Sequence, residues 1–309
     1  MATCLVLGGA GFIGSHVAEA LAREGHRVRV FDRPHVDRLA LFPRDKGFEI
    51  LTGDFLNPQS LSPAVRGAEM VFHLVSTTLP QNSNDNPFYD VETNVLGSLR
   101  LLNLCRENGV RKLVFVSSGG TVYGPPRSLP VPESHPTDPI SSYGIHKLMV
   151  EKYLQLAHRL HGLEYRIVRP ANLYGPRQRL DTAQGAVAVF LDRALRGEPI
   201  QIWGDGSVVR DYVYVADAVD AILRAARYEG AERIFNIGSG VGVSLTELVA
   251  QIGKVLGRSV NVEHSAPRAV DVPANVLDCT LARRRLGWSA TTALQAGLQR
   301  TCDWLRATR

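Results

Sequence analysis

The sequence of 309 residues predicts an α/β fold, a doubly wound parallel sheet followed by a smaller mixed α/β lobe. Three observations support this fold class. Short β-branched runs alternate with segments of helical period, and the first run ends in a glycine-rich turn. After Pro170 this alternation gives way to loops, short strands and two helices. Such alternation is typical of βα units, whose parallel strands are joined by right-handed crossovers.

The elements of the first half follow from these patterns. Two segments of helical period, 12–24 and 94–107, are each followed by a glycine that favours a helix C-terminus, Gly25 and Gly109. The predicted strands are the apolar runs 4–7, 28–31, 49–51, 70–74 and 112–117. A sheet with helices on both faces is the expected result.

The second half begins with one more strand, 164–169, which leads to Pro170. Beyond it we expect loops, short strands and two helices, 185–196 and 216–226. The run 233–237 is typical of a fully buried strand, so the chain is expected to return to the first sheet near 233–238. We divide the chain into a first domain, 1–170, and a second lobe, 171–309.

Composition narrows the function classes. With 45% hydrophobic residues the chain can bury a large core, and its net charge of +5 comes from Lys and Arg scattered among Asp and Glu. Because the basic residues do not cluster, a nucleic-acid partner is not expected. No apolar run approaches the roughly 20 residues of a membrane span, and the N-terminus lacks a basic leader, so we expect a cytoplasmic protein. The four cysteines lack metal-ligand spacing, so no metal is expected.

A glycine pattern joins the first strand to the first helix. Gly8, Gly11 and Gly14 form G-x-x-G-x-x-G in the strand–turn–helix context of a dinucleotide-binding loop. Glycine permits the tight turn and the close approach of backbone to a pyrophosphate, which the helix N-terminus attracts. The first domain is therefore Rossmann-like.

The second strand ends at Asp32, where a carboxylate can accept hydrogen bonds from the adenosine ribose. This favours NAD over NADP, although Arg33 and Arg38 offer charge for a 2′-phosphate. Asp54, after the third strand, has two interpretations that stay open: it accepts from the adenine amino group, or it caps a turn.

Tyr143 and Lys147 form the candidate catalytic pair. Ser141 is a suitable N-cap for a helix in which these two residues are i and i+4, on one face. A tyrosine with its ordinary pKa of about 10 is a poor base at neutral pH. A neighbouring ammonium and a positive nicotinamide are expected to favour the phenolate.

Tyr-x-x-x-Lys alone is a frequent surface pair, but two further motifs accompany it: SSGGTVYG at 117–124 and RPANLYGP at 169–176. With these motifs and the glycine loop, the chain resembles the extended short-chain dehydrogenase/reductase family, and within it the UDP-glucose 4-epimerases, over nearly its whole length. The resemblance implies that Tyr143 takes the proton of the sugar 4-hydroxyl while hydride passes to the nicotinamide. Lys147 would bind the nicotinamide ribose and lower the pKa of Tyr143. The 4-keto sugar would then turn and accept hydride on its other face.

One position departs from the epimerase pattern. Gly119 stands where the family has a serine that hydrogen-bonds the reacting hydroxyl. Ser118, Thr121 or a water must replace it, unless both hydroxyls only satisfy backbone groups at the strand end. Gly120 and Thr121 occupy the positions of the Asp-Glu pair of 4,6-dehydratases, and decarboxylases keep a Glu at the Thr121 position, so both chemistries fit less well.

The resemblance also implies a nucleotide-sugar site in the second lobe. Trp203 has the alternative of a core position, and for each arginine a surface salt bridge is the alternative. The expected substrate-binding residues are Asn172, Gln201, Trp203, Arg210, Arg268, Asp271 and Asn275. Asn275 stands where glucose-restricted epimerases often have tyrosine, which predicts that 2-acetamido sugars are accepted as well.

The expected cofactor is NAD, and the expected partner is a UDP-sugar. The residues expected at the cofactor are Gly8, Gly11, Phe12, Ile13, Gly14, Asp32, Arg33, Asp54, Phe55, Leu74, Val75, Ser76, Tyr143, Lys147 and Pro170. The resemblance also suggests a homodimer through the helices 94–107 and 142–160. Two alternative functions stay open: another nucleotide-sugar oxidoreductase, dehydratase or decarboxylase of the family, and a non-catalytic NAD-binding protein.

Overall fold

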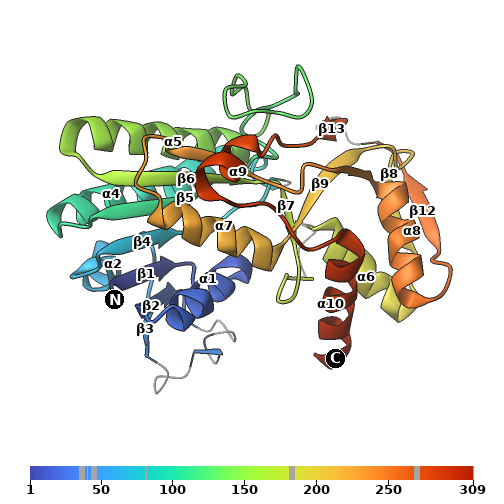
Figure 1. Cartoon of the computed structure of the whole chain (residues 1–309), viewed down its shortest axis with the longest axis horizontal. Helices are drawn as coiled ribbons and strands as arrows, with labels where there is room; N and C mark the ends of the chain where they lie inside the picture. Colours follow the sequence, from blue (N-terminus) through green and yellow to red (C-terminus); the bar gives the residue numbers. More distant parts are fainter. Residues whose placement is uncertain are drawn as a thin grey trace.

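The computed structural model describes residues 1–34, 39, 41–42, 47–80, 82–180, 185–267 and 272–308. Its main feature is a seven-stranded sheet with the strand order β10-β6-β5-β4-β1-β2-β3 (Figure 1). All six pairings in it are parallel. The strands are β1 (Thr3–Leu7), β2 (Arg27–Asp32), β3 (Phe48–Thr52), β4 (Met70–His73), β5 (Lys112–Val116), β6 (Glu164–Pro170) and β10 (Ile234–Ile237).

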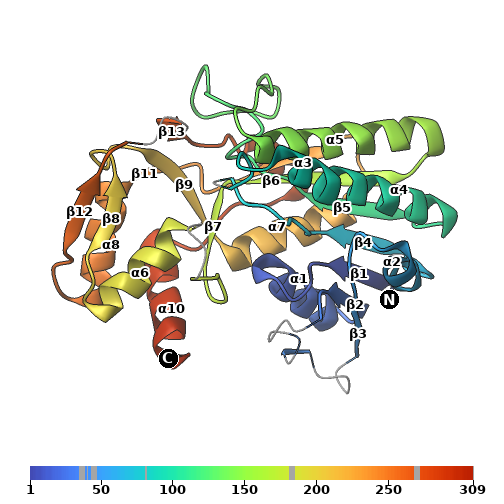
Figure 2. The same ribbon diagram turned by 180° about the vertical axis from the view of Figure 1, so that it is seen from behind.

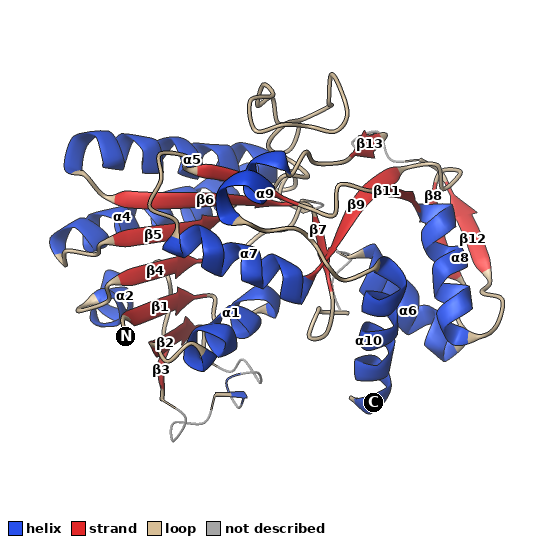
Figure 3. Ribbon diagram, viewed as in Figure 1, coloured by secondary structure: helices blue, strands red, loops and turns tan. Residues whose placement is uncertain are grey.

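Helices cover both faces of this sheet (Figures 2 and 3). In β1, Cys4 and Val6 belong to one apolar core and Leu5 and Leu7 to another, as the alternation of side chains along a strand requires. The first core includes residues of α1 (Phe12–Arg23) and α7 (Val215–Arg227). The second includes residues of α2 (Pro58–Val65), α4 (Gly97–Glu107) and α5 (Ser142–His161). The predicted fold class is confirmed.

The helix predicted over 94–107 begins earlier than expected. The structure has a short helix α3 (Pro87–Asp90), then a π-helical stretch η3 (Val91–Leu96), which continues directly into α4. The start is set by Asn86, whose side chain accepts from the Tyr89 N–H, and by Pro87 at the first helical position. These are ordinary start signals for a helix, and the apolar period alone did not reveal them.

The part of the chain after Pro170 is richer in helices than predicted. Sequence analysis expected two helices after Pro170, α6 (Ala186–Arg196) and α7, but the described residues also form α8 (Leu245–Leu256), α9 (Thr280–Leu286) and α10 (Leu294–Ala307). The missed signal for α8 was a capping box between Ser244 and Glu247. The strands are β7 (Asn172–Tyr174), β8 (Ile200–Trp203), β9 (Val209–Tyr214), β11 (Gly242–Ser244), β12 (Val262–Ser265) and β13 (Ala274–Asn275).

The strand order places the functional residues. The chain runs outward from β1 to β3 on one side and from β4 to β10 on the other, so the order reverses between β1 and β4. Ligands of such sheets bind at the carboxyl ends of the strands beside this switch point. The second lobe lies beyond the same edge (Figure 1).

Two further observations concern the described residues. No helix among them has the length and apolar character needed to cross a membrane. All four cysteines are free thiols, and no His, Cys, Asp and Glu side chains of the described chain gather into a metal-binding group.

Candidate active site

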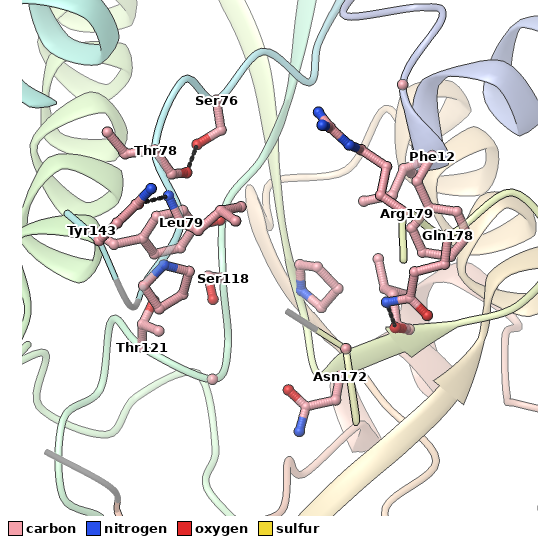
Figure 4. A pocket seen from close by; sticks show the side chains of 18 of the residues that line it. Phe12, Ser76, Thr78, Leu79, Ser118, Thr121, Tyr143, Asn172, Gln178 and Arg179 are labelled. Atoms are coloured by element: carbon pink, nitrogen blue, oxygen red, sulfur yellow. Dashed lines mark hydrogen bonds between the residues drawn. The ribbon is translucent and has the colours of Figure 1, made fainter. Parts of the chain in front are cut away.

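A cleft of about 1890 Å³ opens between the sheet edge and the second lobe. Figure 4 shows Ser118, Thr121 and Tyr143 on one wall, near Ser76 and Thr78 of the segment after β4. In the same view Phe12, Gln178 and Arg179 lie across the cleft. Every residue expected at the cofactor lines this cleft.

The glycine loop has the form that a dinucleotide requires. Gly8 has a φ of +74°, and a β-carbon at Gly14 would collide with the carbonyl oxygen of Gly8. Helix α1 begins after Gly11, which has no side chain to cap the first N–H groups. These N–H groups and the helix dipole therefore face the cleft as an anion site. The loop fits a dinucleotide diphosphate.

Asp32 and Asp54, the two carboxylates near this loop, accept hydrogen bonds from backbone N–H groups. Asp32 accepts from the N–H of Ala10 at 2.9 Å and from that of Arg33 at 2.8 Å, which fixes its carboxylate at the end of β2. Asp54 accepts from the N–H of Leu56 at 2.9 Å, so the turn interpretation is confirmed while its side chain still lines the cleft. Arg38 lies outside the described residues.

Tyr143 and Lys147 meet as the i, i+4 spacing predicts. Ser141 accepts from the Gly144 N–H and caps α5. The Lys147 Nζ lies 5.5 Å from the centre of the Tyr143 ring and donates to the Val116 carbonyl at 3.1 Å. Both groups are buried enough to disfavour charge: burial raises the pKa of Tyr143 to about 12 and lowers the pKa of Lys147 to about 8. In the protein alone, burial therefore outweighs the effect expected of the ammonium on the phenol.

The glycine at 119 has a packing reason. A β-carbon there would lie 2.5 Å from Leu277 Cδ1 and 2.9 Å from the Arg169 carbonyl oxygen, so no room exists for a serine. Nearby, Thr121 Oγ1 is buried without a hydrogen-bond partner among the described residues. Ser118 lines the cleft as well.

The second lobe contributes the opposite part of the cleft. Trp203 is 38% exposed and lines the cleft, which excludes the core position considered for it. Gln201 is held by Glu263 and Ser265. The Arg210 guanidinium donates to the Val272 carbonyl at 2.7 Å. The expected residues found in the lining are Asn172, Gln201, Trp203, Arg210 and Asn275. Arg268 and Asp271 lie outside the described residues.

Asn275 is buried and donates from Nδ2 to the Gly119 carbonyl at 3.2 Å. It thereby joins β13 of the second lobe to the loop that follows β5. The position expected to influence sugar size is thus also in contact with the loop that carries Ser118 and Thr121.

Polar residues hold the start of α5, a role that no motif of the sequence assigned to them. The N–H of Tyr143 donates to Ser83 Oγ at 3.0 Å, and that of Ser142 donates to Asn84 Oδ1 at 2.8 Å. Asp90 and His146 are buried close by, and their ring and carboxylate atoms lie 2.9 Å apart. His146 directly precedes Lys147 in the sequence, which was the one signal available for it.

Comparison with known proteins agrees with this geometry. The family model for the NAD dependent epimerase/dehydratase family matches residues 4–238. The chain is 38% identical over 306 residues to the UDP-glucose 4-epimerase of Mycolicibacterium smegmatis, which covers 98% of each chain. It superposes on the UDP-glucose 4-epimerase of Thermotoga maritima with UDP-glucose with a TM-score of 0.94, at 38% identity over 99% of each chain. For the Thermus thermophilus UDP-glucose 4-epimerase in complex with NAD, the TM-score is 0.92 at 34% identity, over 99% of this chain and 100% of the other.

Proposed function

Because the chain belongs to the NAD dependent epimerase/dehydratase family, we propose that it is an NAD-dependent UDP-hexose 4-epimerase. The observation that carries this proposal is the pairing of Tyr143 and Lys147 on the wall of a cleft whose other side is a dinucleotide loop. Gly120 and Thr121 supply no carboxylate beside that pair, which favours epimerisation over dehydration or decarboxylation.

The chain's own residues fit NAD. The N-terminus of α1 would take the diphosphate, Asp32 the adenosine ribose and Lys147 the nicotinamide ribose. When bound, NAD supplies a hydride acceptor that later returns the hydride. We propose that residues 1–170 carry this function and that residues 171–309 hold the nucleotide sugar.

Tyr143 is proposed to hold the proton of the sugar 4-hydroxyl on Oη during oxidation and to return it on reduction. With a pKa raised to about 12 by burial, the phenol is a weak acid in the protein alone. Positive charge beside it lowers that pKa because it stabilises the phenolate. Lys147 provides one such charge, and its Nζ is fixed by the Val116 carbonyl.

A second hydroxyl is proposed to bind the reacting sugar hydroxyl in place of the serine absent at Gly119. The structure supports Thr121, because its buried Oγ1 has no partner in the described part of the chain and a buried hydroxyl without a partner is costly. Ser118 is the other hydroxyl on this wall.

The nucleotide end of the substrate is proposed to lie against β8 and β9. Trp203 is an exposed aromatic residue in the lining of the cleft, which suits stacking on uracil, and Gln201 lies two residues before it on β8. Arg210 would bind the diphosphate, together with Arg268, and Asp271 the uridine ribose. Asn275, with its short side chain, is proposed to leave room for a 2-acetamido group, so that UDP-GlcNAc and UDP-GalNAc are accepted.

We also propose a homodimer through α4 and α5, working in the cytoplasm. The support is a row of exposed apolar side chains on α5: Ile145 (47%), Leu156 (47%) and Leu160 (62%). Exposed apolar patches of this kind mark interaction surfaces. Sedimentation should show a dimer that Leu156→Glu dissociates, whereas Val241→Glu, at an exposed residue elsewhere, leaves it intact. Four free thiols suit a reducing compartment.

The test is product analysis by NMR with catalytic amounts of protein and UDP-glucose or UDP-GlcNAc. The 4-epimer should form without added reductant, and Tyr143→Phe should abolish it. Stoichiometric growth of NADH absorbance would instead indicate a net oxidoreductase. Tight NAD binding with no turnover on any nucleotide sugar would indicate a non-catalytic binding protein.

A further inference from the structure

A buried carboxylate lies directly behind the catalytic tyrosine. Asp90 is 0% exposed, and four side chains donate to it. Oδ1 accepts from Thr78 Oγ1 and from Asn94 Nδ2 at 3.0 Å. Oδ2 accepts from Ser142 Oγ at 2.6 Å and lies 2.9 Å from His146 Nδ1. All lone-pair directions of this carboxylate are thus used inside the protein.

These donors come from three segments that meet at the catalytic helix. Thr78 belongs to the segment after β4, Asn94 to η3, and Ser142 and His146 to the first turns of α5. Tyr143 lies between the two α5 donors in the sequence, and its ring meets the His146 imidazole edge to face at 4.9 Å between centroids. Asp90 therefore fixes the helical turn that presents the phenol.

The hydrogen bonds also define the charge states of Asp90 and His146. The hydrogen bonds donated to the Asp90 carboxyl lower its pKa, although burial alone would raise it. Burial lowers the pKa of His146 to about 4, with a further contribution from the Lys147 charge. At neutral pH the imidazole is neutral, Nδ1 carries the hydrogen donated to Asp90, and Nε2 is a buried acceptor with no partner among the described residues. The negative charge of Asp90 is consequently not cancelled by its partners.

The second carboxylate near Lys147 differs in this respect. Glu151 is also fully buried, but Arg169 donates to both of its oxygens, from Nε at 3.0 Å and from Nη2 at 2.5 Å. Its charge is balanced by that bidentate pair. Asp90 has only neutral donors, so it supplies the uncompensated negative charge that faces Lys147.

We propose that Asp90 is a positioning residue of this site, which fixes Tyr143 through Ser142 and His146 and keeps Lys147 in its charged form. The catalytic part of this inference rests on the proposed function. The groups that face Lys147 are Asp90 from α3, Glu151 and His146 from its own helix, His73 from β4 and the phenol of Tyr143. Both histidines are neutral at pH 7, since burial lowers the pKa of His73 to about 3.

The first test measures the charge effect without any substrate. The chain has five lysines, so protein labelled with ¹³C at lysine Cε gives a resolvable NMR spectrum, in which Lys147→Met identifies one signal. The wild-type Lys147 signal should titrate near the pKa of about 8. Asp90→Asn should lower that midpoint by roughly half to one pH unit, because it removes one negative charge at short range.

Asp90→Asn suits this test because the amide keeps the shape of the carboxyl. Its NH₂ group can donate to Ser142 Oγ and to His146 Nδ1 after a change of tautomer, so the fold is retained. Glu92→Gln is the matched control, an equal loss of charge at an exposed position two residues away. The midpoint of Lys147 should not move in this control. An unmoved midpoint in Asp90→Asn, in a protein with a wild-type melting curve, would overturn the charge effect.

The second test separates position from charge by kinetics. His146→Leu removes the donor to Asp90, whereas His146→Asn retains one, so kcat should fall about tenfold in the first and recover in the second, with KM unchanged in both. Asp90→Asn should move both limbs of the pH profile to lower pH, since Asp90 raises the pKa of Lys147 and of Tyr143 alike. Equal kcat in the two His146 variants would overturn the positioning role. A wild type that forms no 4-epimer would refute the proposed function, while the lysine titration would still decide the charge effect.

Discussion

Leu277 occupies the space beside Gly119 in which a side chain would stand, with its Cδ1 2.5 Å from the position of a β-carbon there. Leu277 is completely buried, and its N–H donates to Asp211. The lack of a side chain at Gly119 and the presence of this leucine are therefore one packing solution. A serine introduced at 119 alone is expected to disturb the loop.

Gly119→Ser should lower the free energy of unfolding by about 1–3 kcal/mol, because it overpacks the contact with Leu277. Leu277→Ala should cost about 2–5 kcal/mol by leaving a cavity. The double variant should be more stable than the sum of these losses predicts, since each change relieves the other. Urea unfolding of the four proteins measures the coupling, and strict additivity would show that the two residues do not compete for space.

Thr121→Val should reduce kcat by about 10- to 100-fold, because valine keeps the shape of threonine but cannot bond the sugar hydroxyl. Thr121→Ser should retain most of the activity, and Ser118→Ala serves as the comparison. Steady-state kinetics on UDP-glucose measure all three. If Ser118→Ala loses more activity than Thr121→Val, Ser118 is the hydroxyl that replaces the family's serine.

Tyr143→Phe should lower kcat by at least about 100-fold, because it removes the hydroxyl that is proposed to hold the proton of the sugar 4-hydroxyl. NAD binding should be retained, because the ring still packs against His146. Quenching of tryptophan fluorescence by NAD and product NMR measure the two properties separately. Substantial turnover by this variant would remove Tyr143 from the proposed proton transfer.

Stability should fall as the pH drops from about 6.5 toward 4. Burial lowers the pKa of His146 to about 4 and that of His73 to about 3 in the folded protein, whereas unfolded histidine titrates near 6.5. Between these values the unfolded chain binds more protons, so the stability rises with pH by up to about 1.4 kcal/mol per unit for each histidine. Urea unfolding at pH 7, 6 and 5 measures the slope, which His146→Asn should reduce. A slope unchanged by that variant would show that His146 does not take part.

Asn275→Tyr should abolish activity on UDP-GlcNAc and UDP-GalNAc while activity on UDP-glucose persists at a reduced level. The bulkier ring would fill the proposed acetamido space, and the bond from Asn275 to the Gly119 carbonyl would be lost. Asn275→Ser is the control that removes the same bond without adding bulk. Equal loss on both sugar pairs in Asn275→Tyr would refute the role in sugar size.

The first domain could be predicted from sequence because its signals are local. The period of apolar residues, the glycines after β1 and the Tyr143–Lys147 spacing each act within a few residues. The helices after Pro170 were underestimated. A capping box marks the start of α8, whereas α9 and α10 have no side-chain cap, so their helical form depends on packing between elements. Its strands are two to six residues long, and several pair with distant partners.

Within the site, residues in motifs were foreseen and residues that support them were not. The contact between Leu277 and Gly119 joins segments 158 positions apart, so no local sequence pattern could indicate it. Asp90 and His146 share no motif, and their pairing depends on how α3 packs on α5. The pKa of Tyr143 could not be foreseen either, because the sequence reveals neighbouring charges but not the depth of burial.

Epimerisation as proposed requires that C4 of the sugar is oxidised and reduced again within one active site. The decisive experiment uses UDP-glucose carrying deuterium at C4, incubated in ordinary water with catalytic amounts of protein and followed by ²H and ¹H NMR. We expect UDP-galactose with the deuterium still at C4 and no accumulation of reduced cofactor. Deuterium washed out into water, or a product other than the 4-epimer, would refute the proposed epimerisation.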